Sequence, residues 1–217
     1  MFIQNRKELV RIRKNRSLFS VSLLALLVAI LIAGCASSNK PSKEQTSTNQ
    51  LDQVVVNIHS DGNYVFEDQA WMTSKEDVMK AKGFNQADVN GKDRLIAKGE
   101  FPLDESFNQL VIYNFEDDQL VSGEYLFSVA DKERFTALSK ELKILLSSSL
   151  EAPISNDLSL LDEAASAAQE GKHVMWEGKD KSNLRLNVLT TTNVGKMEYL
   201  LQIQSNSPRP AKKTLHS

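Results

Sequence analysis

The sequence predicts an α+β fold, an antiparallel sheet with about three helices packed on one of its faces. Segments with the residue pattern of strands are grouped towards the two ends of the folded region, and segments with the pattern of helices lie between them. This grouping differs from the regular alternation of strands and helices that builds a parallel sheet. Short turn sequences also join neighbouring strand segments directly, which is typical of antiparallel pairing.

The first elements are expected to be a β-hairpin and a short helix. Residues 53–58 include three consecutive valines and favour a strand, and Asp61-Gly62 predicts the turn to a second strand over residues 64–66. Residues 73–80 begin with hydroxyl side chains that can cap a helix and continue with acids that suit its positive end. Gly83 is expected to end this helix.

The middle of the chain predicts three strands and then two helices. The strands are expected over residues 94–101, 109–115 and 120–129, with an acidic turn over residues 116–119 between the last two. Asp131 is expected to cap a helix that runs to about Leu150. Apolar residues recur along it at helical spacing, namely Phe135, Leu138, Leu142, Leu145 and Leu146.

A second helix and a three-stranded meander complete the predicted domain. The helix is expected over residues 157–170, and Gly171 ends it. The meander is expected over residues 173–176, 184–190 and 197–203.

The N-terminus has the pattern of an export signal. Six basic residues precede an uncharged apolar stretch from Leu18 to Ala33. Residues 32–35, Ile-Ala-Gly-Cys, resemble the lipobox of bacterial lipoproteins, in which a signal peptidase cuts before the cysteine and the thiol then carries lipid. The resemblance implies cleavage between Gly34 and Cys35, and acyl chains such as palmitate on Cys35 that anchor the protein without a membrane span.

An uncleaved signal anchor is the alternative to a lipoprotein signal, because the basic flank resembles the cytoplasmic flank of an anchor. The apolar stretch is slightly short for a span. The lipoprotein interpretation implies a localisation at the cell membrane or outer membrane, with the domain outside the cytoplasm. Ala36 follows the cysteine where an aspartate would favour retention in the inner membrane of enterobacteria.

The chain is therefore expected to have four parts. Residues 1–34 are the predicted signal peptide, and the polar residues 35–50 are a lipidated flexible tether. Residues 51–206 have the length of a single α+β domain. Residues 207–217 are expected to be a disordered tail.

Composition and motifs exclude several classes of function. Residues 1–34 hold six of the 26 basic and one of the 28 acidic residues, so the rest of the chain carries a net charge of about −7. This balance argues against nucleic acid as a partner. The only cysteine lies in the lipobox, and no motif for nucleophilic catalysis, nucleotide binding or metal binding occurs. The sequence predicts no catalytic residue, no metal site and no cofactor.

A few polar residues remain as weak candidates. The three histidines, His59, His173 and His216, are far apart in the sequence and are interpreted as surface residues. Residues 88–93 superficially suggest a calcium loop, but position twelve of such a loop would be Gly99 rather than a glutamate. The acidic residues 116–118 are interpreted as a solvated hairpin tip rather than a cation site.

The two tryptophans are the candidate binding surface. Trp71 precedes the first predicted helix and could also act as its hydrophobic staple. Trp176 lies in a predicted strand beside a turn, where core packing at the end of the sheet is favoured over a role in binding.

Two segments of the domain carry a second resemblance. They are residues 71–78, Trp-Met-Thr-Ser-Lys-Glu-Asp-Val, and residues 111–120, Val-Ile-Tyr-Asn-Phe-Glu-Asp-Asp-Gln-Leu. They resemble small envelope lipoproteins of the SmpA/BamE kind and the related β-lactamase-inhibitor-like repeat. The chain departs from that pattern, since Met72 replaces a glycine and the Gly-x-Pro after the helix is absent. The resemblance implies a binding module without catalytic residues.

The sequence predicts a membrane-anchored envelope lipoprotein whose domain is a non-enzymatic binding or scaffolding module. The expected partners are the membrane, through the N-terminal lipid, and an envelope protein or cell-wall component. Immunity and inhibitor proteins of the envelope form a subclass that the sequence does not separate. The alternative is an envelope enzyme or small-ligand-binding protein with a site assembled from scattered residues.

Overall fold

The computed structural model describes residues 43–85, 91, 93–99 and 106–208. The predicted cleavage site at Gly34, the predicted lipidation site at Cys35 and most of the residues 88–93 lie outside the described residues. Within those residues, no helix is both long enough and apolar enough to cross a membrane.

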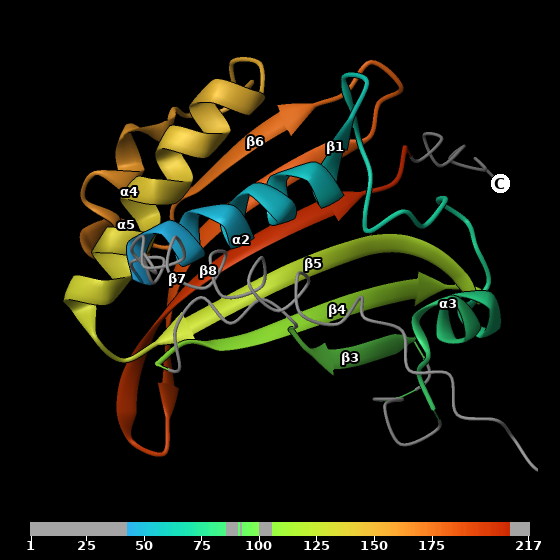
Figure 1. Ribbon diagram of the computed structural model, residues 1–217, viewed down its shortest axis with the longest axis horizontal. Helices are drawn as coiled ribbons and strands as arrows, with labels where there is room; N and C mark the ends of the chain where they lie inside the picture. The colour runs from blue at the N-terminus through green and yellow to red at the C-terminus, as the bar shows by residue number, and fades with distance from the viewer. Residues whose placement is uncertain (1–42, 86–90, 92, 100–105, 209–217) are drawn as a thin grey trace, which may run out of the picture. The chain divides into compact units, whose positions relative to one another are not determined.

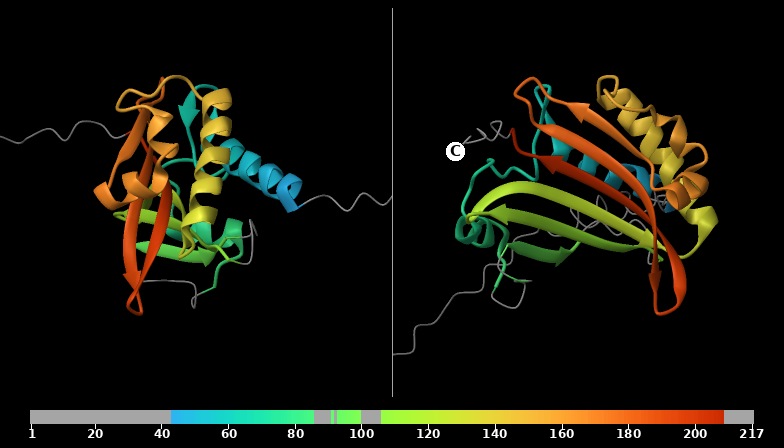
Figure 2. Two further views of the ribbon diagram at one scale, coloured as in Figure 1. Left: turned by 90° about the vertical axis from the view of Figure 1, so that its left-hand side faces the viewer. Right: turned by 180° about the vertical axis from the view of Figure 1, so that it is seen from behind.

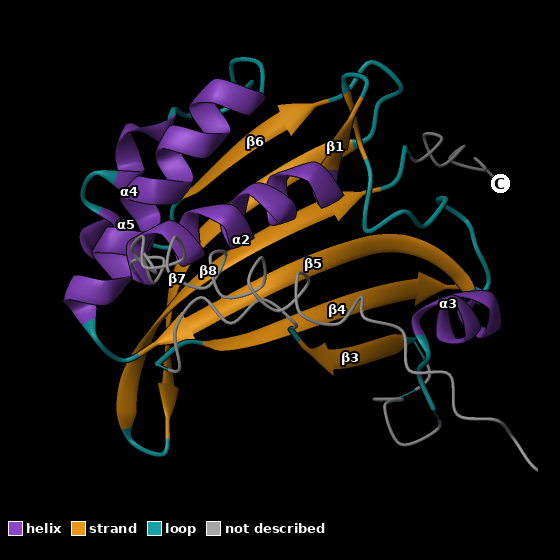
Figure 3. Ribbon diagram, in the orientation of Figure 1, coloured by secondary structure: helices purple, strands orange, loops and turns teal. Residues whose placement is uncertain are grey.

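The fold is α+β, as predicted, and is built on a six-stranded antiparallel sheet in the order β3-β4-β5-β8-β7-β6. Three helices, α2, α4 and α5, cover one face of this sheet, and α3 lies at one end of it (Figures 1 to 3). The opposite face carries no described helix. The four α-helices of the described part exceed the prediction by one. Their bounds are Lys43–Ile58 for α2, Lys75–Lys82 for α3, Lys132–Ser149 for α4 and Ala164–Glu170 for α5.

The six strands fall into two meanders that meet in the middle of the sheet, where β5 pairs with β8. The first meander contains β3 (Arg94–Lys98), β4 (Asn108–Glu116) and β5 (Gln119–Val129), and the second contains β6 (His173–Glu177), β7 (Asn183–Asn193) and β8 (Lys196–Asn206). All six strands were predicted, with ends that differ by a few residues. The acidic turn between β4 and β5 is confirmed, because Asp117 and Asp118 both have positive φ.

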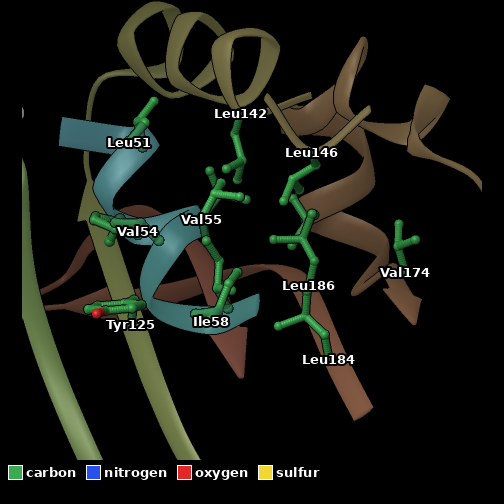
Figure 4. Close-up of a cluster of buried hydrophobic side chains, with 14 of the residues drawn as sticks. Leu51, Val54, Val55, Ile58, Tyr125, Leu142, Leu146, Val174, Leu184 and Leu186 are labelled. Atoms are coloured by element: carbon green, nitrogen blue, oxygen red, sulfur yellow. The ribbon is translucent and has the colours of Figure 1, made fainter. Parts of the chain in front are cut away.

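The prediction of a strand over residues 53–58 is wrong, because these residues form the end of α2. Four apolar side chains at helical spacing are buried along this helix, namely Leu51, Val54, Val55 and Ile58. Figure 4 shows Val54 above Tyr125 of β5 and Val55 beside Leu142 of α4. Packing of this apolar stripe outweighs the weak preference of valine for strands. The helix also includes residues 43–50, so the prediction of a flexible tether is wrong for these residues, and residues 35–42 lie outside the described residues.

The predicted turn and helix that follow α2 are confirmed. Asp61 and Gly62 have φ of 55° and 82° and connect β1 (His59–Ser60) to β2 (Asn63–Tyr64), two short strands that form a separate hairpin. The side chain of Ser74 caps α3 by accepting from the backbone N–H of Asp77 at 3.1 Å, and Gly83 ends the helix with φ of 70°.

The helix predicted over residues 157–170 is divided into a 3-10 turn, Leu158–Leu161, and α5. The break lets Leu161 and four alanines of α5 all become buried. Small alanine side chains let this short helix pack closely against β7.

The folded region extends slightly beyond residue 206. The backbone N–H of Ser207 donates to the carbonyl of Val121 at 2.9 Å, and Ser207 is buried. The prediction of a disordered tail is therefore wrong for Ser207, and residues 209–217 lie outside the described residues.

Candidate functional site

One carboxylate near the end of the sheet gathers four polar side chains around it. Glu67 Oε1 accepts a hydrogen bond from the Tyr125 hydroxyl at 2.7 Å, and Oε2 accepts one from the Tyr113 hydroxyl. Lys82 Nζ lies 3.1 Å from Glu67 Oε2. Asn57 Nδ2 donates to the Tyr125 hydroxyl at 3.0 Å. We call these five residues the Glu67 cluster.

The cluster is built from α2, the loop after β2, the end of α3 and the strands β4 and β5. Asn57 belongs to the last turn of α2, and its carbonyl accepts from the backbone N–H of Glu67 at 2.8 Å. Glu67 itself has φ of 48°, a conformation that non-glycine residues adopt rarely and that functional or tightly packed sites often hold. Tyr113 and Tyr125 lie on the helix-covered side of the neighbouring strands β4 and β5.

A glycine in β5 makes room for the aromatic packing behind the cluster. Phe66 lies with its ring centroid 5.2 Å from that of Tyr113 and 5.1 Å from that of Tyr125. A Cβ atom on Gly123 would come within 2.0 Å of the Phe66 ring. The glycine therefore lets Phe66 pack closely against the strand, in contact with both tyrosine rings.

The cluster is suited to holding its hydrogen bonds rather than to moving protons. Burial raises the pKa of Tyr125 far above its ordinary value, and the negative charge and hydrogen bond of Glu67 raise it further. Tyr125 therefore remains a hydrogen-bond donor at neutral pH. Three donors converge on the Glu67 carboxylate, which leaves little acceptor capacity for a substrate proton.

A pocket of about 220 Å³ opens beside the cluster. Its wall combines apolar and charged side chains: Asn57, Glu67, Asp68, Lys82, Phe84, Ala97, Lys98, Val111 and Tyr113. Phe84 packs edge-on against Tyr113, with ring centroids 5.6 Å apart. Asp68 and Lys98 are exposed, and neither forms an ion pair with another described residue. The pocket thus has a floor held by hydrogen bonds and two exposed charged groups without an ion-pair partner among the described residues.

The uncovered face of the sheet carries a second polar network. Glu124 of β5 accepts from Asn114 Nδ2 at 3.1 Å and from the side-chain amide of Gln202. Asn114 in turn accepts from Arg94 Nε at 3.0 Å, and Asn187 Nδ2 donates to Gln202 Oε1 at 2.9 Å. This chain of side chains crosses five strands, from β3 to β7. We call it the amide ladder, and its members form hydrogen bonds with one another.

The two tryptophans differ in how deeply they are buried. Trp176 is 1% exposed and its indole N–H donates to the carbonyl of Glu151 at 3.0 Å, so the prediction of a binding surface at Trp176 is wrong. The strand that carries it faces the core at alternate positions, and Trp176 occupies one of them. Trp71 is partly buried against the core and donates to the carbonyl of Tyr64 at 3.0 Å.

The remaining polar candidates do not come together. The His59 ring lies 5.7 Å from the ring of Tyr64, whereas His173 begins β6 and His216 lies outside the described residues. In the described part of the chain, no group of three or more histidine, cysteine, aspartate or glutamate side chains is arranged to hold a metal ion.

Sequence reasoning did not identify Glu67, Lys82 or Lys98 as site residues. The two tyrosines offered a clue in the sequence. Each lies two residues before a phenylalanine, Phe115 or Phe127, and so shares the core-facing side of its strand with that residue. A buried tyrosine hydroxyl needs a partner. Nothing local indicates that this partner is Glu67, 46 residues before Tyr113 in the chain.

Comparison with models of known protein families, with curated proteins and with solved structures found no match for this chain. The resemblances to bacterial lipoproteins and to small envelope modules therefore remain predictions.

Proposed function

We propose that this chain is a lipid-anchored envelope lipoprotein and that its α+β domain is a binding module that holds its ligand at the pocket beside the Glu67 cluster. The lipobox-like residues around Cys35 support the anchor. The anchor places the domain outside the cytoplasm, at the cell membrane or outer membrane.

The observation that supports the binding role is the contrast between the floor of the pocket and the two charged residues at its rim. Its floor is fixed by hydrogen bonds from Tyr113 and Tyr125 to Glu67, whereas Asp68 and Lys98 at its rim have no ion-pair partner among the described residues. Preorganised polar groups beside an aromatic wall, here Phe84, are typical of recognition sites. The pocket is small, so it suits a side chain or terminal segment of a larger partner rather than the whole of it.

The partner class follows from charge and location. The chain after Gly34 has a net charge of about −7, which disfavours nucleic acid. An envelope protein or a cell-wall component that presents a carboxylate to Lys98 and a cation to Asp68 would complement the pocket. Reversing one of these two charges should then weaken binding.

Capture from detergent-solubilised envelopes tests this proposal. Purified wild-type protein is used as bait beside Lys98→Glu, with Lys140→Glu on the exposed surface of α4 as the control of equal charge change. We expect one stoichiometric partner with the wild type and with Lys140→Glu, and a loss of at least tenfold with Lys98→Glu. Equal capture by all three proteins would place the ligand elsewhere.

A further inference from the structure

The hairpin between β7 and β8 extends well beyond the rest of the sheet. The last pair between β5 and β8 joins Val129 to Tyr199. Beyond it, residues 191–193 and 196–198 pair with each other and with no other described strand. Figures 1 and 2 show this hairpin as a projecting arm.

The tip of the arm exposes two apolar side chains that no described element covers. Val194 is 97% exposed and Met197 is 47% exposed. Val194 also has φ of 48°, followed by Gly195 with φ of 76°. Asparagine or aspartate normally occupies the first of these two turn positions, and a β-branched residue is unfavourable there. Neither backbone preference nor packing within the domain therefore accounts for the valine, which points to a contact outside the domain.

The charge of the arm differs from that of the whole domain. Residues 190–197 contain Lys196 and no acidic residue, whereas the chain after Gly34 is acidic overall. The nearest carboxylate along the strand, Glu198, accepts from Asn193 Nδ2 at 3.0 Å. Lys196 forms no ion pair with a described residue. The tip is thus the part of the hairpin that an anionic surface would repel least.

The position of the arm indicates which surface it meets. In Figure 1 the beginning of α2 lies at the left at mid-height and the tip of the arm at the lower left, and the left-hand view of Figure 2 shows the two on opposite sides of that end of the domain. Lys43, the first residue of α2, is only eight residues after Cys35. Eight extended residues span less than about 30 Å, so a lipid on Cys35 would keep this end of the domain close to the bilayer.

We propose that the β7–β8 tip is a second membrane contact, in which Val194 and Met197 enter the interface of the bilayer and Lys196 stays at the level of the lipid phosphates. This inference rests on the lipid anchor of the proposed function. Apolar side chains flanked by a lysine are a common composition for interfacial insertion. The contact would fix the orientation of the domain, which an acylated cysteine alone leaves free.

A single-cysteine dye experiment tests the contact. Val194→Cys is purified from bacterial membranes, labelled with an environment-sensitive thiol dye and reconstituted into phosphatidylethanolamine–phosphatidylglycerol vesicles that contain nitroxide-labelled lipid. Ile144→Cys, at a 69% exposed apolar position on α4, is the matched control. Unsubstituted protein shows whether Cys35 itself takes up dye.

We expect one dye per chain, a blue shift with strong nitroxide quenching at position 194, and water-like emission without quenching at position 144. One dye per chain with water-like emission at both positions would overturn the membrane contact and leave the anchor intact. A shift at position 194 that needs added envelope protein, and fails with pure lipid, would also overturn it and assign the tip to a protein partner. Two dyes per chain would show a free Cys35 and so contradict the proposed function itself.

Discussion

The two faces of β5 bury carboxylates in different ways. On the helix-covered face, Tyr125 and its neighbour Tyr113 donate to Glu67, a residue from a distant loop. On the uncovered face, Glu124 is 5% exposed although no described helix covers it, and amide side chains of adjacent strands surround it. The first arrangement joins separate parts of the fold, whereas the second joins strands that the backbone already pairs.

This difference predicts unequal energetic roles for the two networks. Loss of a long-range polar contact should loosen the loop that forms the pocket, together with the end of α2. Loss of a cross-strand contact leaves the backbone ladder in place to hold the same strands together. Substitutions on the two faces of the same strand should therefore lower the free energy of unfolding by different amounts.

The largest expected effect comes from filling the space behind the Glu67 cluster. Gly123→Ala would drive a methyl group into the Phe66 ring, and we expect a loss of about 3 kcal/mol in the free energy of unfolding. Urea unfolding followed by circular dichroism measures this loss. Ser122→Ala, the neighbouring position on the other face, is the control, with an expected loss below about 1 kcal/mol. Equal midpoints for the two variants would contradict the packing account.

Removing the charge of Glu67 should have the next largest effect. Glu67→Gln weakens three charge-assisted contacts at once, and we expect a loss of about 2 kcal/mol in the free energy of unfolding. The same substitution in a Tyr125→Phe background should cost distinctly less, because one of the contacts is already absent. Additive losses in this double-mutant cycle would indicate that the two side chains do not interact.

Stability should fall at alkaline pH because two buried tyrosines resist ionisation. Burial, together with the charge of Glu151, raises the pKa of Tyr64 to about 12, and burial and Glu67 raise the pKa of Tyr125 further still. The unfolded chain ionises its tyrosines near pH 10, so it binds fewer protons than the folded chain above that pH.

The contribution of each tyrosine to the free energy of unfolding is thus complete below pH 10. It is lost above that pH, at about 1.4 kcal/mol per pH unit. Urea midpoints between pH 8 and pH 11 measure this decline, and Tyr64→Phe should reduce its slope. A slope that the substitution leaves unchanged would show that Tyr64 does not contribute.

The smallest effect is expected on the uncovered face. Glu124→Gln keeps the shape of the side chain and one acceptor oxygen, and a neighbouring amide can reorient to meet the new N–H group. We expect a loss of about 1 kcal/mol or less, measured by urea unfolding beside Glu67→Gln. A larger loss for Glu124→Gln than for Glu67→Gln would reverse the comparison between the two faces.

The sequence was sufficient for most of the fold because local signals agreed with the tertiary structure. Asp131 and Gly171 cap helices as expected, and the turn at Asp117-Asp118 separates two predicted strands. The end of α2 was mispredicted because Val54, Val55 and Val56 suggested a strand. The helical spacing of Val54 and Val55 with Leu51 and Ile58 was the better indicator, since packing against α4 and the sheet decides the outcome.

The candidate site was far less predictable than the fold. Its residues come from the end of α2, the loop after β2, the end of α3 and the strands β3 and β4, and only the folded chain brings them together. Tryptophan was a poor guide, because Trp176 fills the core. The unusual position of Val194 could not be predicted from the sequence either, because it depends on the turn conformation and on the lack of a described element that covers the side chain.

The most direct test of the central claim, a lipid-anchored binding domain, is the intact mass of the protein purified from bacterial membranes, beside a Cys35→Ser variant. The account predicts a wild-type chain that begins at Cys35, carries added acyl mass and partitions with the membrane, and a variant without acyl mass. A wild-type chain that retains residues 1–34 with an unmodified thiol, and a variant that stays equally in the membrane, would contradict it.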